Sequence, residues 1–146
     1  MSFAIKTNDS IIFGANPIAC YGSSLYSDNI DRFTQLGNNF VFSASGDYSD
    51  FMKISEELNE MWYKESVYEG VQNVNVEKYA NYTQNLCYAR RNKVDPFLID
   101  GVIGGFDQDG NNRLYYVDQF GMFLEKNYVC SGVGNYMLPA SVGTLI

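Results

Sequence analysis

One stretch, residues 79–118, limits the possible folds more than any other part of the chain, because it predicts a helix followed directly by a β-hairpin. Positions three and four residues apart share one helical face in its first part (Tyr79, Thr83, Leu86 and Arg90). The helix is expected to end at 94–96, since the residue before Pro96 is pushed out of the helical region. Residues 98–106 and 113–118 then predict two strands joined by a polar turn rich in Asp, Gly and Asn.

Strands are also predicted on both sides of a helical pair. Alternating or continuous apolar residues indicate strands at 2–7, 11–15, 31–36, 40–45, 122–125 and 128–131, while residues 20–29 predict a loop. A first helix follows an N-cap at Asp47 or Ser49, and its apolar side chains form one stripe (Phe51, Ile54, Leu58, Met61 and Trp62). Asn75 caps the second helix. This grouping predicts an α+β fold in which two antiparallel sheets lie face to face with the helices outside.

The totals exclude several classes of protein. A chain of 146 residues is one domain's worth, and residues 1–146 are interpreted as a single domain. A net charge of −7 argues against a nucleic-acid partner, and no apolar run reaches the roughly 18 residues that a membrane span needs. The first residues lack the pattern of a signal peptide. Neither a membrane nor a nucleic acid is therefore an expected partner.

The cysteine and histidine content limits which disulfides, catalytic sites and metal sites the chain can form. The three cysteines (Cys20, Cys87 and Cys130) are widely spaced, which favours reduced, buried thiols over a disulfide framework. The absence of histidine removes Ser-His-Asp chemistry and most zinc sites. The series Asp107, Asp109, Asn111 resembles the start of a calcium loop, but Asn112 stands where glycine is needed, so a plain hairpin turn is favoured. No cofactor and no metal are expected.

Several motifs in fixed order carry a resemblance to a known family. They are Ile-Ile-Phe-Gly-Ala-Asn at 11–16, Ser-Gly-Asp-Tyr-Ser-Asp-Phe at 45–51, Tyr-Ala-Arg-Arg-Asn-Lys-Val-Asp-Pro at 88–96, Ile-Gly-Gly at 103–105, Leu-Tyr-Tyr-Val-Asp at 114–118 and Ser-Gly-Val-Gly at 131–134. Together they resemble the β-type subunits of the proteasome core particle. The resemblance implies a four-layer αββα sandwich of the N-terminal-nucleophile hydrolase type. The family's fold continues beyond the third helix, so residues 1–146 are expected to be incomplete at the C-terminus.

The resemblance also implies where catalytic groups would stand. Catalytic members use an N-terminal threonine supported by an aspartate, a lysine and a serine. The aspartate position reads Asn16, the lysine position reads Arg32, the serine position reads Asn135, and the threonine's place falls before Met1. Asparagine has no charge to orient a lysine, and arginine does not release its proton near neutral pH. These departures indicate a vacant pocket and a non-catalytic subunit.

We therefore expect a structural β subunit of the 20S proteasome, located in cytoplasm and nucleus, that helps to enclose a chamber for protein degradation. Its expected partners are other β subunits in the same and the opposite ring and subunits of the α ring. Two alternatives stay open: a threonine peptidase whose nucleophile is exposed by processing, and a free-standing binding domain.

The candidate contact residues cluster after the second helix and on the hairpin. Arginine and tyrosine are enriched at protein interfaces, which makes subunit contact one reading of these side chains (Tyr88, Arg90, Arg91, Lys93, Tyr115 and Tyr116). The cations equally suit the negative end of a helix dipole, and the tyrosines equally suit core packing.

Overall fold

The computed structural model describes residues 2–15, 19–21, 24–27, 32–37, 39–68, 75–107 and 110–131. The strands in these ranges are β1 (Ser2–Lys6), β2 (Ile11–Ala15), β3 (Ala19–Tyr21), β4 (Ser24–Ser27), β5 (Phe33–Leu36), β6 (Phe40–Gly46), β7 (Ile99–Phe106), β8 (Asn112–Val117), β9 (Phe123–Glu125) and β10 (Tyr128–Ser131). The helices are α1 (Tyr48–Tyr68) and α2 (Val76–Arg90).

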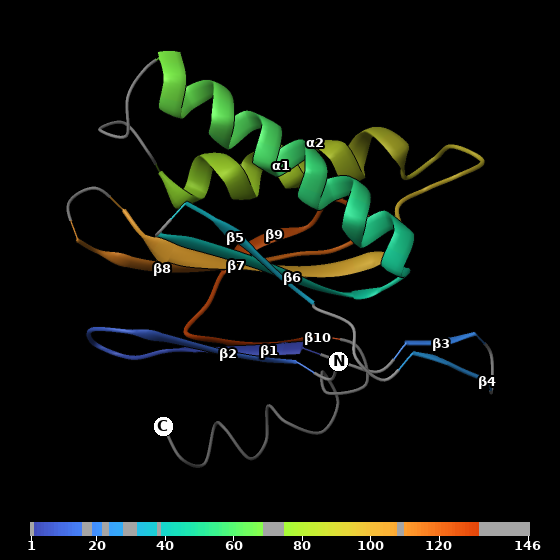
Figure 1. The fold of residues 1–146 in the computed structure, drawn as a ribbon, viewed down its shortest axis with the longest axis horizontal. Coiled ribbons are helices and arrows are strands. Elements are labelled where there is room, and N and C mark those ends of the chain that lie inside the picture. Colours follow the sequence, from blue (N-terminus) through green and yellow to red (C-terminus); the bar gives the residue numbers. More distant parts are fainter. Residues whose placement is uncertain are drawn as a thin grey trace.

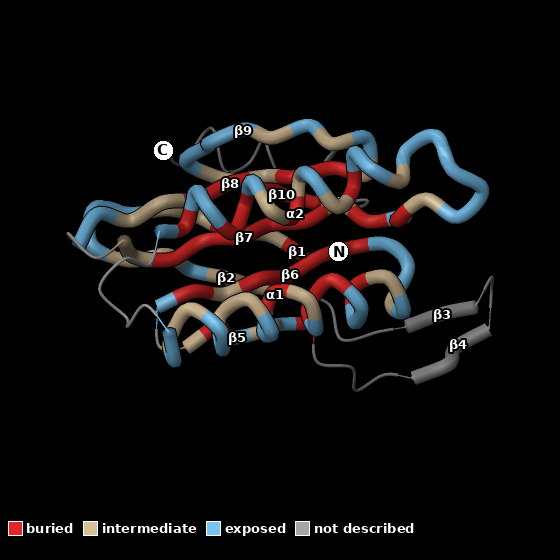
Figure 2. Tube along the Cα trace, turned by 90° about the horizontal axis from the view of Figure 1, so that it is seen from above, coloured by how far each residue is buried: buried red, intermediate tan, exposed pale blue. Residues whose placement is uncertain are grey.

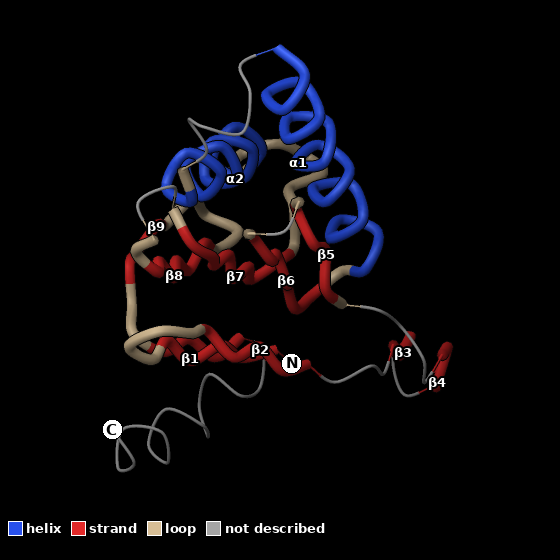
Figure 3. The backbone as a smooth tube through the Cα atoms, turned by 60° about the vertical axis from the view of Figure 1, so that its left-hand side comes forward, coloured by secondary structure: helices blue, strands red, loops and turns tan. Residues whose placement is uncertain are grey.

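The strands form antiparallel sheets that stack in layers. A five-stranded sheet has the order β5-β6-β7-β8-β9, and a three-stranded sheet has the order β10-β1-β2. Helices α1 and α2 cover one face of the larger sheet, and the smaller sheet lies against its other face (Figure 1). The same three layers are visible from a second direction (Figure 3). The predicted α+β class is confirmed, and so is the helical pair between two groups of strands.

The prediction of a loop over residues 20–29 was wrong for the residues that the structure describes there, 20–21 and 24–27. Strands β3 and β4 form a two-stranded antiparallel sheet in which Cys20 pairs with Leu25. With three and four residues, these strands are too short for alternation to appear in the sequence, whereas backbone pairing depends little on side-chain type.

Both helices begin where the sequence predicts. Asp47 Oδ1 accepts a hydrogen bond from Ser49 N (2.8 Å) at the start of α1, and Asn75 Oδ1 accepts one from Glu77 N (2.8 Å) at the start of α2. These side-chain oxygens satisfy N–H groups that have no partner within a helix. Helix α2 ends at Arg90, slightly before the proline that was expected to stop it.

The main core lies between the helices and the larger sheet. Phe42 of β6 stacks on Phe51 of α1 with ring centroids 5.6 Å apart, and Phe40 contacts Trp62 and Tyr79. The buried part of the chain follows β6 and β7, the central strands (Figure 2). A second, smaller core joins the two sheets (Ala4, Val102, Leu114 and Val129). The predicted apolar stripe of α1 faces the main core.

The described cysteines are free and buried, as predicted. Burial raises the pKa of the Cys87 thiol to about 11 and also raises the pKa of Cys130. Both thiols are therefore protonated at neutral pH and unreactive. The side chain of Cys20 lies outside the described residues. Neither α1 nor α2 has an apolar stretch that is long enough to cross a membrane.

We predict that Gly105→Ala destabilises the fold by about 2–3 kcal/mol, the cost typical of overpacking. A Cβ atom at Gly105 would overlap the backbone carbonyl oxygen of Asn39, which cannot move without disturbing the β6–β7 pairing. The matched control is Gly101→Ala on the same strand, where the new Cβ meets a Phe42 ring carbon at 3.1 Å. Urea unfolding of both variants measures the difference, and equal midpoints would contradict this packing.

Candidate functional site

Three serine hydroxyls meet between the two sheets. Ser2 lies on β1, Ser131 on its partner β10 and Ser45 on β6 of the other sheet. The Oγ of Ser131 lies 2.5 Å from the Oγ of Ser2 and 2.7 Å from the Oγ of Ser45, and it is also within 3.1 Å of the Ser2 carbonyl oxygen. All three residues are buried. We call this group the serine cluster.

Mutual hydrogen bonding explains how three polar groups are tolerated at this depth. A buried hydroxyl without a partner costs about 1–3 kcal/mol, and Ser131 supplies a partner to both of the others. The hydrogen bonds of the three oxygens form a polar contact between the two sheets.

Arg32 is the one predicted site residue in this region that the structure describes. It is 8% exposed, and its Nη1 lies 3.5 Å from the carbonyl oxygen of Ala44, the residue before Ser45. Asn16 and Asn135 lie outside the described residues. The structure therefore brings Arg32 to β6, the strand that carries Ser45 of the serine cluster, while the positions of the other two predicted site residues stay untested.

A small pocket opens beside Ser45 of the cluster. It has a volume of about 220 Å³, and its polar lining comes from Ser45, Asp100 and Gln119. Asp100 pairs with Ser45 across β6 and β7. Burial raises the pKa of the Asp100 carboxyl, and the charge of Asp118 raises it further, while a hydrogen bond from Tyr116 lowers it. The described residues contain no His, Cys, Asp or Glu group that could hold a metal ion.

Sequence reasoning missed the serine cluster, although two of its members stand in motifs that it had singled out. Ser45 and Ser131 each close an apolar strand and precede a glycine. A small polar residue at that place reads as the start of a turn. Only the stacking of the sheets brings the two strand ends to Ser2, which is 129 residues from Ser131 along the chain.

The predicted contact residues divide into exposed and buried members. Tyr88 is 55% exposed, and the guanidinium of Arg91 lies 4.3 Å from the centre of its ring. Lys93 is exposed in the turn that follows, and the guanidinium of Arg90 lies over the ring of Phe97.

The hairpin tyrosines lie deeper. Tyr115 is buried and stacks on Phe123 with centroids 5.0 Å apart, and burial raises the pKa of its hydroxyl to about 12. Tyr116 is half-buried between the sheets, under the ammonium group of Lys126. The rings of these two tyrosines are engaged within this chain, so the exposed contact candidates are Tyr88, Arg91 and Lys93.

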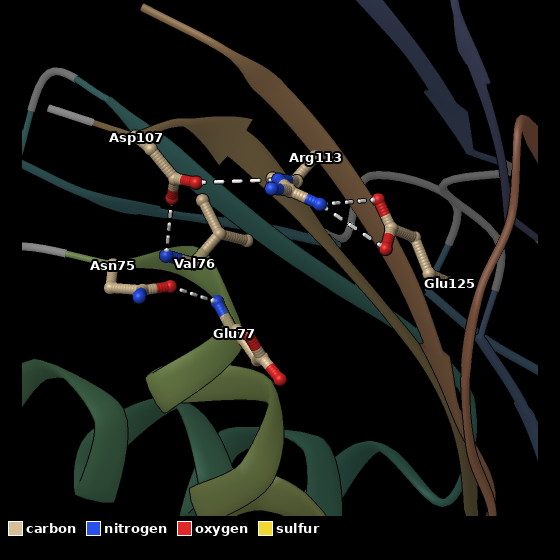
Figure 4. Close-up of polar contacts among 6 residues, drawn as sticks. All are labelled: Asn75, Val76, Glu77, Asp107, Arg113 and Glu125. Atoms are coloured by element: carbon tan, nitrogen blue, oxygen red, sulfur yellow. Dashed lines mark hydrogen bonds and ion pairs between the residues drawn. The ribbon is translucent and has the colours of Figure 1, made fainter. Parts of the chain in front are cut away.

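Helix α2 is fixed to the sheet at its beginning by a polar network (Figure 4). Asp107, at the end of β7, accepts a hydrogen bond from Val76 N (2.9 Å) and faces the guanidinium of Arg113 (3.4 Å). Arg113 also binds Glu125 of β9 (3.1 Å). Asp107 and Asn75 together satisfy two N–H groups of the first turn.

Comparison with known proteins agrees with this architecture. The family model "Proteasome subunit" matches residues 1–141, and the chain belongs to that family. Among its relatives, "Proteasome subunit beta type-4" of Arabidopsis thaliana is 31% identical over 92% of this chain and 54% of that protein, and the Xenopus laevis protein of the same name is 29% identical over 91% and 54%. "Probable proteasome subunit beta type-7" of Schizosaccharomyces pombe is 32% identical over 78% and 43%.

These similarities confirm the resemblance to a proteasome β subunit, most like beta type-4. The chain spans about half the length of the relatives that it matches.

We predict that Ser131→Ala lowers the free energy of unfolding by about 2 kcal/mol, because it leaves the hydroxyls of Ser2 and Ser45 buried without their shared partner. Replacing all three serines with alanine should cost less than the sum of the three single changes, because no polar group is then left unsatisfied. Ser66→Ala, at a partly exposed position of α1, is the control and should change stability by less than about 0.5 kcal/mol. Additive effects of the three changes would contradict the cluster.

We predict that Asp107→Ala destabilises the protein by about 1 kcal/mol, the typical cost of losing an N-terminal cap. Asp107→Asn is the matched control, because it keeps an oxygen that can accept from Val76 N and loses only the ion pair with Arg113. Thermal unfolding compares the two variants. A loss at least as large for asparagine would show that the ion pair, not the cap, stabilises this corner.

Proposed function

We propose that this chain is a non-catalytic, structural β subunit of the 20S proteasome core particle. The observation that carries the proposal is Arg32: where the family resemblance calls for a lysine, a buried guanidinium lies against the Ala44 carbonyl oxygen. A guanidinium keeps its proton at any physiological pH, so it cannot tune a nucleophile as an amine can. The family membership and the names of the relatives support the assembly.

The serine cluster also supports a non-catalytic role. In a hydrolase of this class, a hydroxyl must be free to attack a carbonyl carbon while a nearby amine takes its proton. The hydroxyls of Ser2, Ser45 and Ser131 are buried and engaged with one another. Their arrangement stabilises the contact of the two sheets.

The proposal extends to fold and partners. We propose that the described helix–sheet–sheet arrangement is part of a four-layer αββα sandwich, with a further helical layer on the three-stranded sheet. Its partners would be β subunits of the same and the opposite ring and α-ring subunits, in the cytoplasm and the nucleus. The tyrosine and cations at the end of α2 would contribute to these contacts; Tyr88, Arg91 and Lys93 are exposed, and Arg90 is half-buried.

The test combines a covalent probe with a native mass measurement. The complex that contains the full-length chain is isolated from its own cells and treated with a peptide inhibitor that reacts with N-terminal threonine nucleophiles. We expect sister β chains to be labelled and this chain to stay unlabelled. Native mass spectrometry should place the chain in a particle with many other subunits.

Two results would overturn the proposal. Labelling of this chain would make it a processed threonine peptidase. A free monomer as the main native species would make it an independent domain. Labelled sister chains in the same sample are the internal control that the inhibitor reacts.

A further inference from the structure

An exposed aromatic surface lies where α2 meets the turn between β8 and β9. Tyr88 and Phe120 are 55% and 61% exposed. Gly121 fits closely beneath Tyr88, since a Cβ atom added to this glycine would lie 2.8 Å from the Cβ of Tyr88. The amide Nε2 of Gln84 donates to the carbonyl oxygen of Gly121 (2.9 Å), which ties the turn to the helix. Two exposed rings are thus held on a fixed backbone.

A cation lies over one of these rings. The guanidinium carbon of Arg91 is 4.3 Å from the centre of the Tyr88 ring, within the range of a cation–π contact. The backbone of Arg91 is also fixed, because its N–H donates to the Tyr88 carbonyl oxygen. We call Tyr88, Arg91 and Phe120 the Tyr88 surface.

The neighbouring Arg90 has a carboxylate partner, whereas Arg91 has none among the described residues. Arg90 lies over the ring of Phe97 and has a carboxylate of its own chain 3.9 Å away, that of Asp95. Within the described ranges, the ion pairs of the chain do not include Arg91. This occurs in a chain that has 17 acidic and 10 basic residues. A guanidinium held over a ring retains N–H donors that suit a carboxylate in bidentate geometry.

We propose that the Tyr88 surface binds an acidic segment of a neighbouring protein subunit, in which a carboxylate pairs with Arg91 and an adjacent apolar side chain packs on Tyr88 and Phe120. The choice of occupant follows from charge complementarity, since Arg91 is a cation without a carboxylate among the described residues. Aromatic residues and arginine on a rigid backbone are also the residues that dominate binding energy at interfaces. That the neighbour is another subunit of one particle rests on the function proposed above.

The first test reverses one charge. Full-length chains with Arg91→Glu or Lys53→Glu are expressed with a tag in the cells of origin, and native gels measure the fraction of each in the large complex. Lys53 is an exposed cation on α1 that is not among the candidate contact residues, and the two variants change the net charge equally. We expect Arg91→Glu to reduce incorporation by about tenfold or more, as for an arginine that anchors an interface, and Lys53→Glu to leave it nearly unchanged.

The second test captures the partner carboxylate. Arg91→Lys places a reactive amine at this position, and a zero-length carbodiimide reagent joins amines to carboxylates that are in contact. In the purified complex we expect residue 91 to be linked to an aspartate or glutamate of another subunit, identified by peptide sequencing. Asn92→Lys is the matched control, with an amine at the next exposed residue, and it should give little of this product.

The outcomes separate the two proposals. If the unaltered chain is found in no complex, the proposed function fails. If the unaltered chain assembles but Arg91→Glu and Lys53→Glu incorporate equally, the inference about the Tyr88 surface fails alone. Links from residue 91 only to carboxylates of its own chain, or no link at all, would also overturn it.

Discussion

The pairing of β6 with β7 is the constraint on which the other layers depend. These strands are hydrogen-bonded from Phe40–Gly105 to Gly46–Ile99, and both faces of the pair are covered. Side chains alternate between the faces of a strand, so Phe40 and Phe42 reach the helices while Ser45 reaches the other sheet. A register shift of one residue would exchange these two sets and bury the wrong side chains on both faces. The close fit of Gly105 against Asn39 helps to prevent that shift.

The contact between the two sheets contains both apolar and polar side chains. Apolar packing at Ala4, Val102 and Leu114 holds the sheets together in the middle, and the serine cluster joins them at one end. Polar groups at this depth are tolerated only when they are hydrogen-bonded. At this end of the sandwich, the three hydroxyls bond to one another.

On the helical face of the larger sheet, α2 is held in place near both of its ends. Helix α2 is fixed at its beginning by Asn75 and Asp107, and near its end by Gln84 on Gly121. With both ends fixed, the side chains of the last turn are presented in defined positions. Preorganised side chains lose less conformational freedom on binding. In the contact proposed for the Tyr88 surface, Tyr88 and Arg91 would therefore lose little conformational freedom on binding.

The sequence by itself determined the helices, the main strands and the α+β class, because apolar periodicity and capping residues such as Asp47 and Asn75 are local signals. It also determined the family, because motifs in a fixed order can be recognised without knowing which residues are in contact. The short strands β3 and β4 were missed, because three or four residues carry too little pattern. Only the tertiary structure decided that Ser2, Ser45 and Ser131 meet, that Tyr115 is buried while Tyr88 is exposed, and that Arg32 lies against β6. Each of these depends on which faces the sheets and helices cover, and that is set by packing between residues far apart in the chain.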